Sequence, residues 1–286
     1  MNTLELIERM SARLEEAGVS FGHGTTNAFD EAAWLVLWQL GVPLDALDDV
    51  AEQPVAAPQL QAVEQLVAQR IATRRPAAYL TGEAWLQGVA FHVDERVIVP
   101  RSLIAEPMVD GTLDTWLPQR TRRVLDLCTG NGSLAVLAAL TWPEVSVDAT
   151  DISADALVVA AMNVQRHGLA DRITLRQGDA LAAAKGTYDL ILCNPPYVND
   201  AAMLALPAEY RAEPALALAG GKDGLDFIRR LLRSAARFMN EQAMLVLEIG
   251  NERAHFEAAY PHLPVVWLPT SAGDDQVLLI DKPSLQ

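Results

Sequence analysis

The residues with the clearest chemical potential in this chain are Asn194-Pro-Pro-Tyr197, which follow the apolar run at residues 190–193. A short apolar run of this kind is typical of a buried strand. The two prolines make the backbone rigid after that strand, and because proline has no N–H, the carbonyl of Pro195 is free to accept a hydrogen bond. The side-chain oxygen of Asn194 and this carbonyl therefore offer two acceptors at one strand end, with Tyr197 as a wall beside them.

Two acceptors so close together suit a planar NH2 group, which carries two donors. An amide nitrogen is a poor nucleophile because its lone pair is delocalised. Acceptors that hold its hydrogens direct that lone pair toward an electrophile and stabilise positive charge on nitrogen. We therefore predict that Asn194, Pro195 and Tyr197 are catalytic and that Pro196 contacts the substrate with them. A simple turn is the alternative explanation for any Pro-Pro pair.

A second candidate site is the segment Asp126-Leu-Cys-Thr-Gly130-Asn-Gly132, between an expected strand and an expected helix. Its glycines let the backbone approach a ligand closely, and the N-terminus of the following helix offers free N–H groups. Asp151 ends the next expected strand, where its carboxylate is placed to accept from ribose hydroxyls. The spacing Gly130-x-Gly132-x-x-Ala135 also suits a dinucleotide, so at this point a nicotinamide-dependent oxidoreductase remains open.

The elements that position these residues follow from hydrophobic spacing. Residues 1–82 follow a helical period and predict a small helical domain, with Trp34 and Trp38 in its core. From residue 106 to 286, apolar runs alternate with helical patterns, which predicts a mostly parallel sheet with helices on both faces. The expected strands are residues 124–128, 145–150, 173–176, 190–193, 244–249, 265–268 and 277–280, and the expected helices among them are residues 134–140, 154–168 and 225–238.

Residues 83–105 change to a period of two and predict a hairpin that links the two domains. Apolar residues alternate from Val89 to Val93, and residues 97–99 continue as an extended run. Asp94-Glu95 lies between these runs and is the expected turn of the hairpin.

Four features together resemble class I S-adenosylmethionine-dependent methyltransferases that act on an amino nitrogen: the turn at residues 126–132, Asp151, Gly178-Asp179 and Asn194–Tyr197. DNA-adenine and ribosomal-RNA methyltransferases share the last of these. Two further segments, Gly82-Glu-Ala-Trp-Leu-Gln-Gly88 and Phe91-His-Val-Asp-Glu-Arg-Val-Ile-Val-Pro-Arg-Ser102, follow the helical domain. This arrangement resembles the HemK-like N5-glutamine methyltransferases over nearly the whole chain.

The residues after the expected hairpin are similar to one branch of that family. Its release-factor enzymes carry Pro-Arg-Pro-Glu-Thr-Glu there, whereas this chain has Pro100-Arg-Ser-Leu-Ile-Ala-Glu106. That segment, with Glu213-Pro-Ala-Leu-Ala-Leu-Ala-Gly-Gly221 and Asp223-Gly-Leu, resembles the branch that methylates ribosomal protein L3 of the large subunit. The resemblance implies a Rossmann-like, seven-stranded, mostly parallel sheet. It implies a helical substrate-recognition domain at residues 1–82, a hairpin linker at 83–105 and a methyltransferase domain at 106–286.

The resemblance also implies S-adenosyl-L-methionine as cofactor, with S-adenosyl-L-homocysteine as product, and a direct in-line transfer of the methyl group to the glutamine nitrogen without a metal. The implied cofactor residues are Cys128, Thr129, Gly130, Asn131 and Gly132 at the methionine end with Asp126 behind them, Asp151 and Ile152 at the ribose, Asp179 and Ala180 at the adenine, and Asn194. The implied glutamine-binding residues are Asn194, Pro195, Pro196 and Tyr197. Arg101 and Glu106 would either position the substrate or support the linker, and the sequence does not choose between these roles.

Net charge limits the partners of the chain. Twenty-two Lys and Arg against 37 Asp and Glu leave −15, and residues 1–60 contain ten acidic side chains but only two arginines. A nucleic-acid-binding surface is normally basic, so we expect no direct binding to nucleic acid. A strongly basic ribosomal protein would be attracted to such a surface.

Three alternatives remain open. Release factors would be the substrate if the chain methylates glutamine but does not belong to the branch that acts on ribosomal protein L3. An amino-directed RNA or DNA methyltransferase explains Asn194–Tyr197 equally well but conflicts with the charge. A non-catalytic scaffold is disfavoured because the whole tetrapeptide is present.

The remaining composition points away from metal and membrane. Five histidines show no ligand spacing, and two cysteines make neither a disulfide framework nor a zinc cluster, so we predict free thiols at Cys128 and Cys193. No apolar run approaches the roughly 18 residues that cross a bilayer. We therefore expect a cytoplasmic protein with no metal and no membrane contact.

Overall fold

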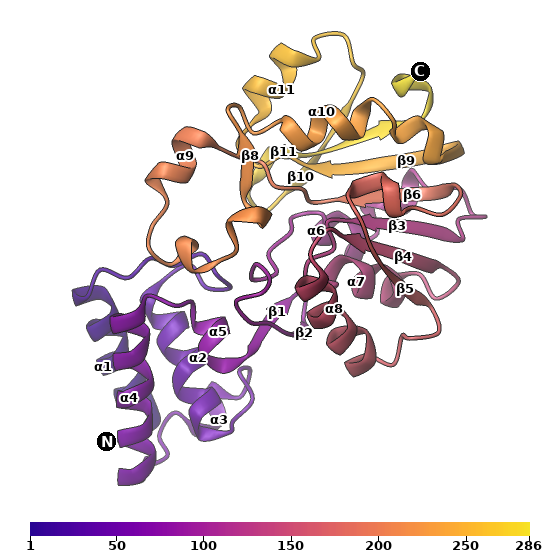
Figure 1. Ribbon diagram of the computed structural model, residues 1–286. Coiled ribbons are helices and arrows are strands. Elements are labelled where there is room, and N and C mark those ends of the chain that lie inside the picture. The colour runs from indigo at the N-terminus through magenta and orange to yellow at the C-terminus, as the bar shows by residue number, and fades with distance from the viewer.

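The computed structural model describes residues 1–286. A seven-stranded sheet forms the centre of its C-terminal part (Figure 1). The strand order is β10-β11-β9-β6-β3-β4-β5. Only β11 runs antiparallel to its neighbours β9 and β10, so the predicted mostly parallel, seven-stranded sheet is confirmed. The strands are β3 (Arg123–Leu127), β4 (Ser146–Asp151), β5 (Ile173–Gln177), β6 (Tyr188–Cys193), β9 (Met239–Glu248), β10 (Val266–Thr270) and β11 (Gly273–Asp281).

Both faces of the sheet are covered by helices, as the continuous apolar strands require. Along β6, Leu190 and Leu192 pack in the cluster that includes α7 (Ser133–Thr141), whereas Ile191 and Cys193 pack in the cluster of α10 (Asp226–Leu232) and α11 (Arg253–Ala259). The expected helix at 225–238 ends early, because α10 stops at Leu232 and a 3-10 turn follows at Ala235–Phe238. Helix α8 (Ala154–Arg166) follows β4.

The N-terminal part is helical, as predicted. It contains α1 (Thr3–Glu16), α2 (Ala28–Leu40), α3 (Leu47–Val50), α4 (Ala57–Thr73) and α5 (Ala77–Thr81). Asn27 caps α2 by accepting from the N–H of Asp30, and Gly41 ends it in the left-handed conformation. Trp34 is buried as predicted, but the prediction that Trp38 belongs to the core is wrong, since Trp38, one turn further along α2, is 39% exposed.

The linker does contain a hairpin, but its turn is not at Asp94-Glu95. Strands β1 (Glu83–Leu86) and β2 (Val89–His92) pair through a two-residue turn at Gln87-Gly88, where both residues have positive φ. Such a turn matches the twist of a hairpin, and glycine supplies one of its two left-handed positions. The chain also turns at Asp94, whose carbonyl accepts from the N–H of Val97, but no strand pair follows.

The segment after Asn194–Tyr197 lies between the two parts of the molecule (Figure 1). It contains β7 (Val198–Asn199), α9 (Asp200–Ala205) and β8 (Ala219–Gly221), and β7 pairs with β8. Helix α6 (Ala105–Val109) joins the linker to the sheet. None of the helices is both long and apolar enough to cross a membrane. Cys128 and Cys193 are free thiols, as predicted.

Candidate active site

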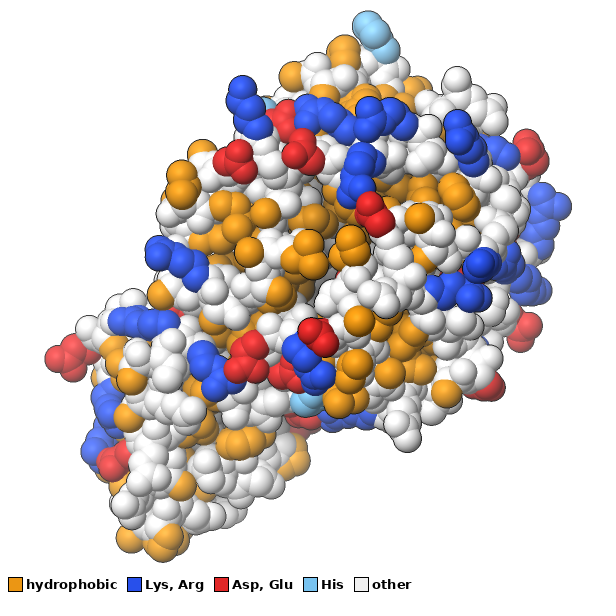
Figure 2. All heavy atoms as spheres, viewed as in Figure 1, with side chains coloured by type: hydrophobic (Ala, Val, Ile, Leu, Met, Phe, Trp, Pro, Cys, Tyr) orange, Lys and Arg blue, Asp and Glu red, His pale blue; other side chains and the backbone are white.

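A cavity of about 150 Å³ lies at the carboxyl ends of β3, β4 and β6, and Figure 2 shows hydrophobic side chains gathered around the hollow on this face. We call it the main cavity. It is lined by eight residues predicted from the sequence: Cys128, Gly130, Asp151, Ile152, Asp179, Ala180, Asn194 and Pro196. Crevices at the carboxyl ends of parallel strands are the usual ligand sites of such sheets.

The turn after β3 is shaped by three left-handed residues, Cys128, Gly130 and Gly132. A side chain at Gly132 would meet Cβ of Ala160 at 3.2 Å, so this glycine allows the N-terminus of α7 to pack closely on α8. At Gly130, by contrast, no atom lies within 4 Å of the position of a Cβ. The space beside Gly130 therefore belongs to the cavity and is open to a ligand.

Asp126 lies behind this turn and does not line the main cavity. Its Oδ2 accepts from Oγ1 of Thr129 at 2.5 Å and from the N–H of Ala135 at 3.1 Å. Burial raises the pKa of Asp126 to about 7, because its partners are neutral. Asn131 is also buried, and its Nδ2 has no hydrogen-bond partner in the chain. Of the residues predicted at the methionine end, only Cys128 and Gly130 line the cavity.

Asp151 ends β4 and faces the main cavity. Its Oδ2 accepts from the N–H of Gly130 and its Oδ1 from the N–H of Ser153, both at 2.9 Å. Burial raises the pKa of Asp151, although these backbone hydrogen bonds oppose the increase. Each carboxylate oxygen keeps a second lone pair, so the fixed side chain retains acceptors for hydroxyl groups of a ligand.

Asp179 and Ala180 lie beyond β5 on the same cavity. The carboxylate of Asp179 pairs with Arg230 at 2.7 Å, and Ala180 is one of the few non-glycine residues with positive φ. Ile152 is half exposed at the cavity rim.

Asn194 and Pro196 reach the main cavity directly from the end of β6, whereas Pro195 and Tyr197 do not line it. The hydroxyl of Tyr197 donates to Oε1 of Glu248 at 3.0 Å, and Oε2 of Glu248 accepts from Oγ of Ser102 and the N–H of Leu103. Burial and the neighbouring Glu248 raise the pKa of Tyr197 well above its usual range. Tyr197 therefore holds the backbone of the tetrapeptide in place from behind.

Arg101 and Glu106 make contacts within the chain. The guanidinium of Arg101 forms two parallel hydrogen bonds with Glu213, at 2.6 and 2.7 Å. The carboxylate of Glu106 accepts from the N–H and the hydroxyl of Ser271. The sequence suggests two roles for Arg101 and Glu106, and these contacts fit support of the linker. Contact of either residue with the substrate stays a prediction.

Eleven further residues line the main cavity and were missed from the sequence: Arg96, Val97, Ile98, Thr150, Ser153, Ala156, Pro214, Leu216, Ala217, Phe227 and Arg230. Most of them lie next to predicted residues or in the two segments that carried the family resemblance. Their chemistry is mainly apolar, so no motif of reactive groups marked them.

Comparison with known proteins agrees with this geometry. Residues 111–211 match the family described as methyltransferase small domain, and residues 5–82 match the PrmC N-terminal domain. A solved methyltransferase from Pyrococcus furiosus has the same fold, with a TM-score of 0.51 at 18% identity over 78% of this chain and 98% of that one.

Two relatives named ribosomal protein uL3 glutamine methyltransferase are much more similar. The protein of Bordetella pertussis is 54% identical, and the alignment covers 98% of this chain and 95% of that protein. The protein of Neisseria gonorrhoeae is 46% identical over 96% of this chain and 92% of that protein. The resemblance seen in the sequence is thereby confirmed, and this chain belongs to the family of uL3 glutamine methyltransferases.

Proposed function

We propose that this chain methylates the side-chain amide nitrogen of a glutamine in ribosomal protein uL3, with S-adenosylmethionine as the methyl donor. The observation that carries this proposal is a single cavity that brings Asn194 and Pro196 together with Gly130 and Asp151. The names of relatives at 46–54% identity support the choice of acceptor.

The residues present fit S-adenosylmethionine. The open space at Gly130 would take the methionine end, and the carboxylate of Asp151 would accept from the ribose hydroxyls. Asp179 and Ala180 would lie at the adenine. When bound, S-adenosylmethionine supplies an electrophilic methyl group.

The role of Asn194–Tyr197 is to orient the amide of the substrate glutamine. Oδ1 of Asn194 and the carbonyl of Pro195 would accept from the two amide hydrogens, so that the nitrogen lone pair points along the line of attack. Orientation of this kind contributes about 7–11 kcal/mol where the reacting atoms are held close and aligned. The same two acceptors stabilise the positive charge that develops on nitrogen, which then releases a proton to water.

The negative charge of this chain supports a strongly basic methyl acceptor, such as a ribosomal protein that ribosomal RNA does not yet cover. The chain carries −15 at neutral pH, so it attracts a free ribosomal protein and repels nucleic acid. We place the reaction in the cytoplasm, on uL3 before or during assembly of the large subunit. Release factors remain the alternative acceptor.

The test offers methyl-labelled S-adenosylmethionine and this protein to free uL3, to intact large subunits and to release factors. We expect label on free uL3, located on a glutamine by mass spectrometry, and faster labelling of the free protein than of the subunit. Label on release factors would keep the chemistry and change the acceptor, and label only on RNA would refute the proposal.

A further inference from the structure

One wall of the main cavity comes from the segment that follows Asn194–Tyr197. We call residues 206–217 the wall segment. It contributes Pro214, Leu216 and Ala217 to the cavity, and the linker contributes Val97 and Ile98. Neither group belongs to the sheet, so something outside the sheet must hold both in place.

Glu213 joins these two walls. Its Oε1 accepts from the N–H of Val99 at 2.9 Å, and both carboxylate oxygens accept from Arg101. Nε2 of His23, from the N-terminal domain, lies 3.5 Å from Oε2. Burial alone would raise the pKa of Glu213, but the contacts with His23 and Arg101 outweigh it and hold this pKa at about 2. An ionised carboxylate therefore sits directly before Pro214 in the wall segment.

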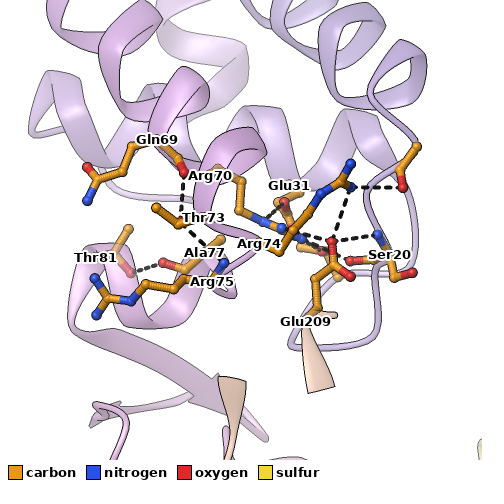
Figure 3. Close-up of polar contacts among 12 residues, drawn as sticks. Ser20, Glu31, Gln69, Arg70, Thr73, Arg74, Arg75, Ala77, Thr81 and Glu209 are labelled. Atoms are coloured by element: carbon orange, nitrogen blue, oxygen red, sulfur yellow. Dashed lines mark hydrogen bonds and ion pairs between the residues drawn. The ribbon is translucent and has the colours of Figure 1, made fainter. Parts of the chain in front are cut away.

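Glu209 ties the same segment to the helices of the N-terminal domain (Figure 3). Its Oε1 accepts from the N–H of Ser20 at 3.1 Å, from Nη1 of Arg70 at 3.2 Å and from Nη1 of Arg74 at 3.4 Å. Arg70 is fully buried and also donates to Glu31 at 2.8 Å and to the carbonyl of Ser20. We call Glu31, Arg70, Arg74 and Glu209 the Glu209 ion cluster.

The Glu209 ion cluster has two charges of each sign, and three of its members, Glu31, Arg70 and Glu209, are buried. Removing one member of a buried pair is therefore much more costly than removing an exposed one. Because Glu209 and Glu213 are four residues apart, both fix the same short stretch of chain. This stretch has little regular structure of its own, only 3-10 turns at Tyr210–Ala212 and Ala215–Ala217.

We propose that Glu209 and Glu213 are positioning residues, which hold the wall segment against the N-terminal domain and so fix the shape of the cofactor cavity. Helix α4, far from the sheet in sequence, thereby acts on the active site through Arg70 and Arg74. The inference rests on the proposed function only in that the main cavity takes S-adenosylmethionine.

The test measures the affinity for S-adenosylmethionine by calorimetry, with no methyl acceptor present. Glu209→Gln keeps the size of the side chain and removes its charge. We expect Glu209→Gln to bind S-adenosylmethionine about tenfold more weakly. An effect of this size is within the range seen for residues that do not touch the ligand. Arg74→Met, which removes a half-exposed partner of Glu209, should weaken binding in the same direction, and the double variant should lose less than the sum of the two.

Two controls separate positioning from loss of stability. Glu64→Gln breaks the ion pair of α4 with Arg9, which does not touch the wall segment. Val63→Ala opens a void in the core of the N-terminal domain. Both should keep wild-type affinity below their melting temperatures, even where Val63→Ala is less stable than Glu209→Gln.

Wild-type affinity in Glu209→Gln and Arg74→Met would refute the inference, as would equal weakening in Val63→Ala. If Glu209→Gln does not fold, Arg74→Met decides alone. A chain that binds S-adenosylmethionine in this cluster-dependent way but labels no uL3 would overturn the proposed acceptor and leave the positioning role intact.

Discussion

Two carboxylates behind the main cavity are buried to a similar degree and yet have opposite pKa shifts. Asp126 has only a hydroxyl and a backbone N–H as partners, so burial dominates and raises its pKa to about 7. Glu213 is equally buried, but the guanidinium of Arg101 and the ring of His23 lie against it, and its pKa falls to about 2. The neighbours of a buried acid thus decide whether it opposes or supports the fold at neutral pH.

Asp126 should make the protein less stable as the pH rises. Its pKa is higher in the folded than in the unfolded chain, so the folded state holds the proton longer, and stability falls between about pH 4 and pH 7. Asp126→Asn cannot ionise and removes this part of the slope. We expect the stability of the variant relative to wild type to rise across this window by a few kcal/mol. Chemical denaturation at a series of pH values measures it, and parallel curves would contradict the assignment.

Asn194 should affect turnover and not cofactor affinity. We expect Asn194→Ala to lower kcat by about 10²–10³, as removal of one preorganised polar group does elsewhere, and to bind S-adenosylmethionine almost as wild type does. Asn240→Ala is a matched control, because the amide of Asn240 donates a hydrogen bond to Asp189. Asp189 is near the start of β6, at the other end of that strand from Asn194. Turnover is measured with methyl-labelled S-adenosylmethionine. Wild-type turnover in Asn194→Ala would show that Asn194 does not orient the substrate amide.

At the scale of elements, β8 fixes the tetrapeptide from the side. The N–H of Val198 donates to the carbonyl of Leu218, and β7 pairs with β8 beside it. Gly220 comes so close that a Cβ there would lie 2.7 Å from the backbone of Tyr197. The wall segment and β8 therefore act together, one holding the cavity wall and the other the strand end that carries Asn194.

Gly220→Ala should push the Tyr197 backbone away and misplace Asn194. A shift of about 1 Å in a reacting group costs up to about 100-fold in rate, so we expect kcat to fall by about 10–100-fold. Gly168→Ala is the control, because that glycine has φ of +67° and open space around it. Its strain should lower the melting temperature without changing kcat, and unchanged kcat in Gly220→Ala would show that the clash relaxes elsewhere.

The elements differ in how far they could be predicted from sequence. Strand ends follow from local hydrophobic runs, so Asp151 and Asn194 could be placed at one edge of the sheet. The hairpin turn was misplaced because Asp94-Glu95 has the more polar turn residues, whereas Gln87-Gly88 has the required backbone geometry. The bond of Glu213 to Arg101 joins residues 112 positions apart, and no local pattern encodes which acid meets which arginine.

At the scale of the whole molecule, the first 60 residues carry more than half of the net negative charge. Asp45, Asp48 and Asp49 are exposed there, near the start of α3. Such a field attracts a basic protein before contact and mainly changes the rate of encounter. The field has little effect once the glutamine lies in the cavity. A change in the field should therefore alter kcat/KM and leave kcat unchanged.

We therefore expect kcat/KM for free uL3 to fall about tenfold between low and high salt, with kcat unchanged, because salt screens the attraction beyond about 10 Å. Neutralising Asp45, Asp48 and Asp49 to Asn should lower kcat/KM at low salt and flatten the salt dependence. The same change in charge at Glu144, Asp171 and Asp274, all exposed in the C-terminal part, should have a smaller effect. Equal effects of the two triple variants would mean that net charge alone attracts the substrate. A larger effect of the first would mean that the N-terminal domain meets uL3 first.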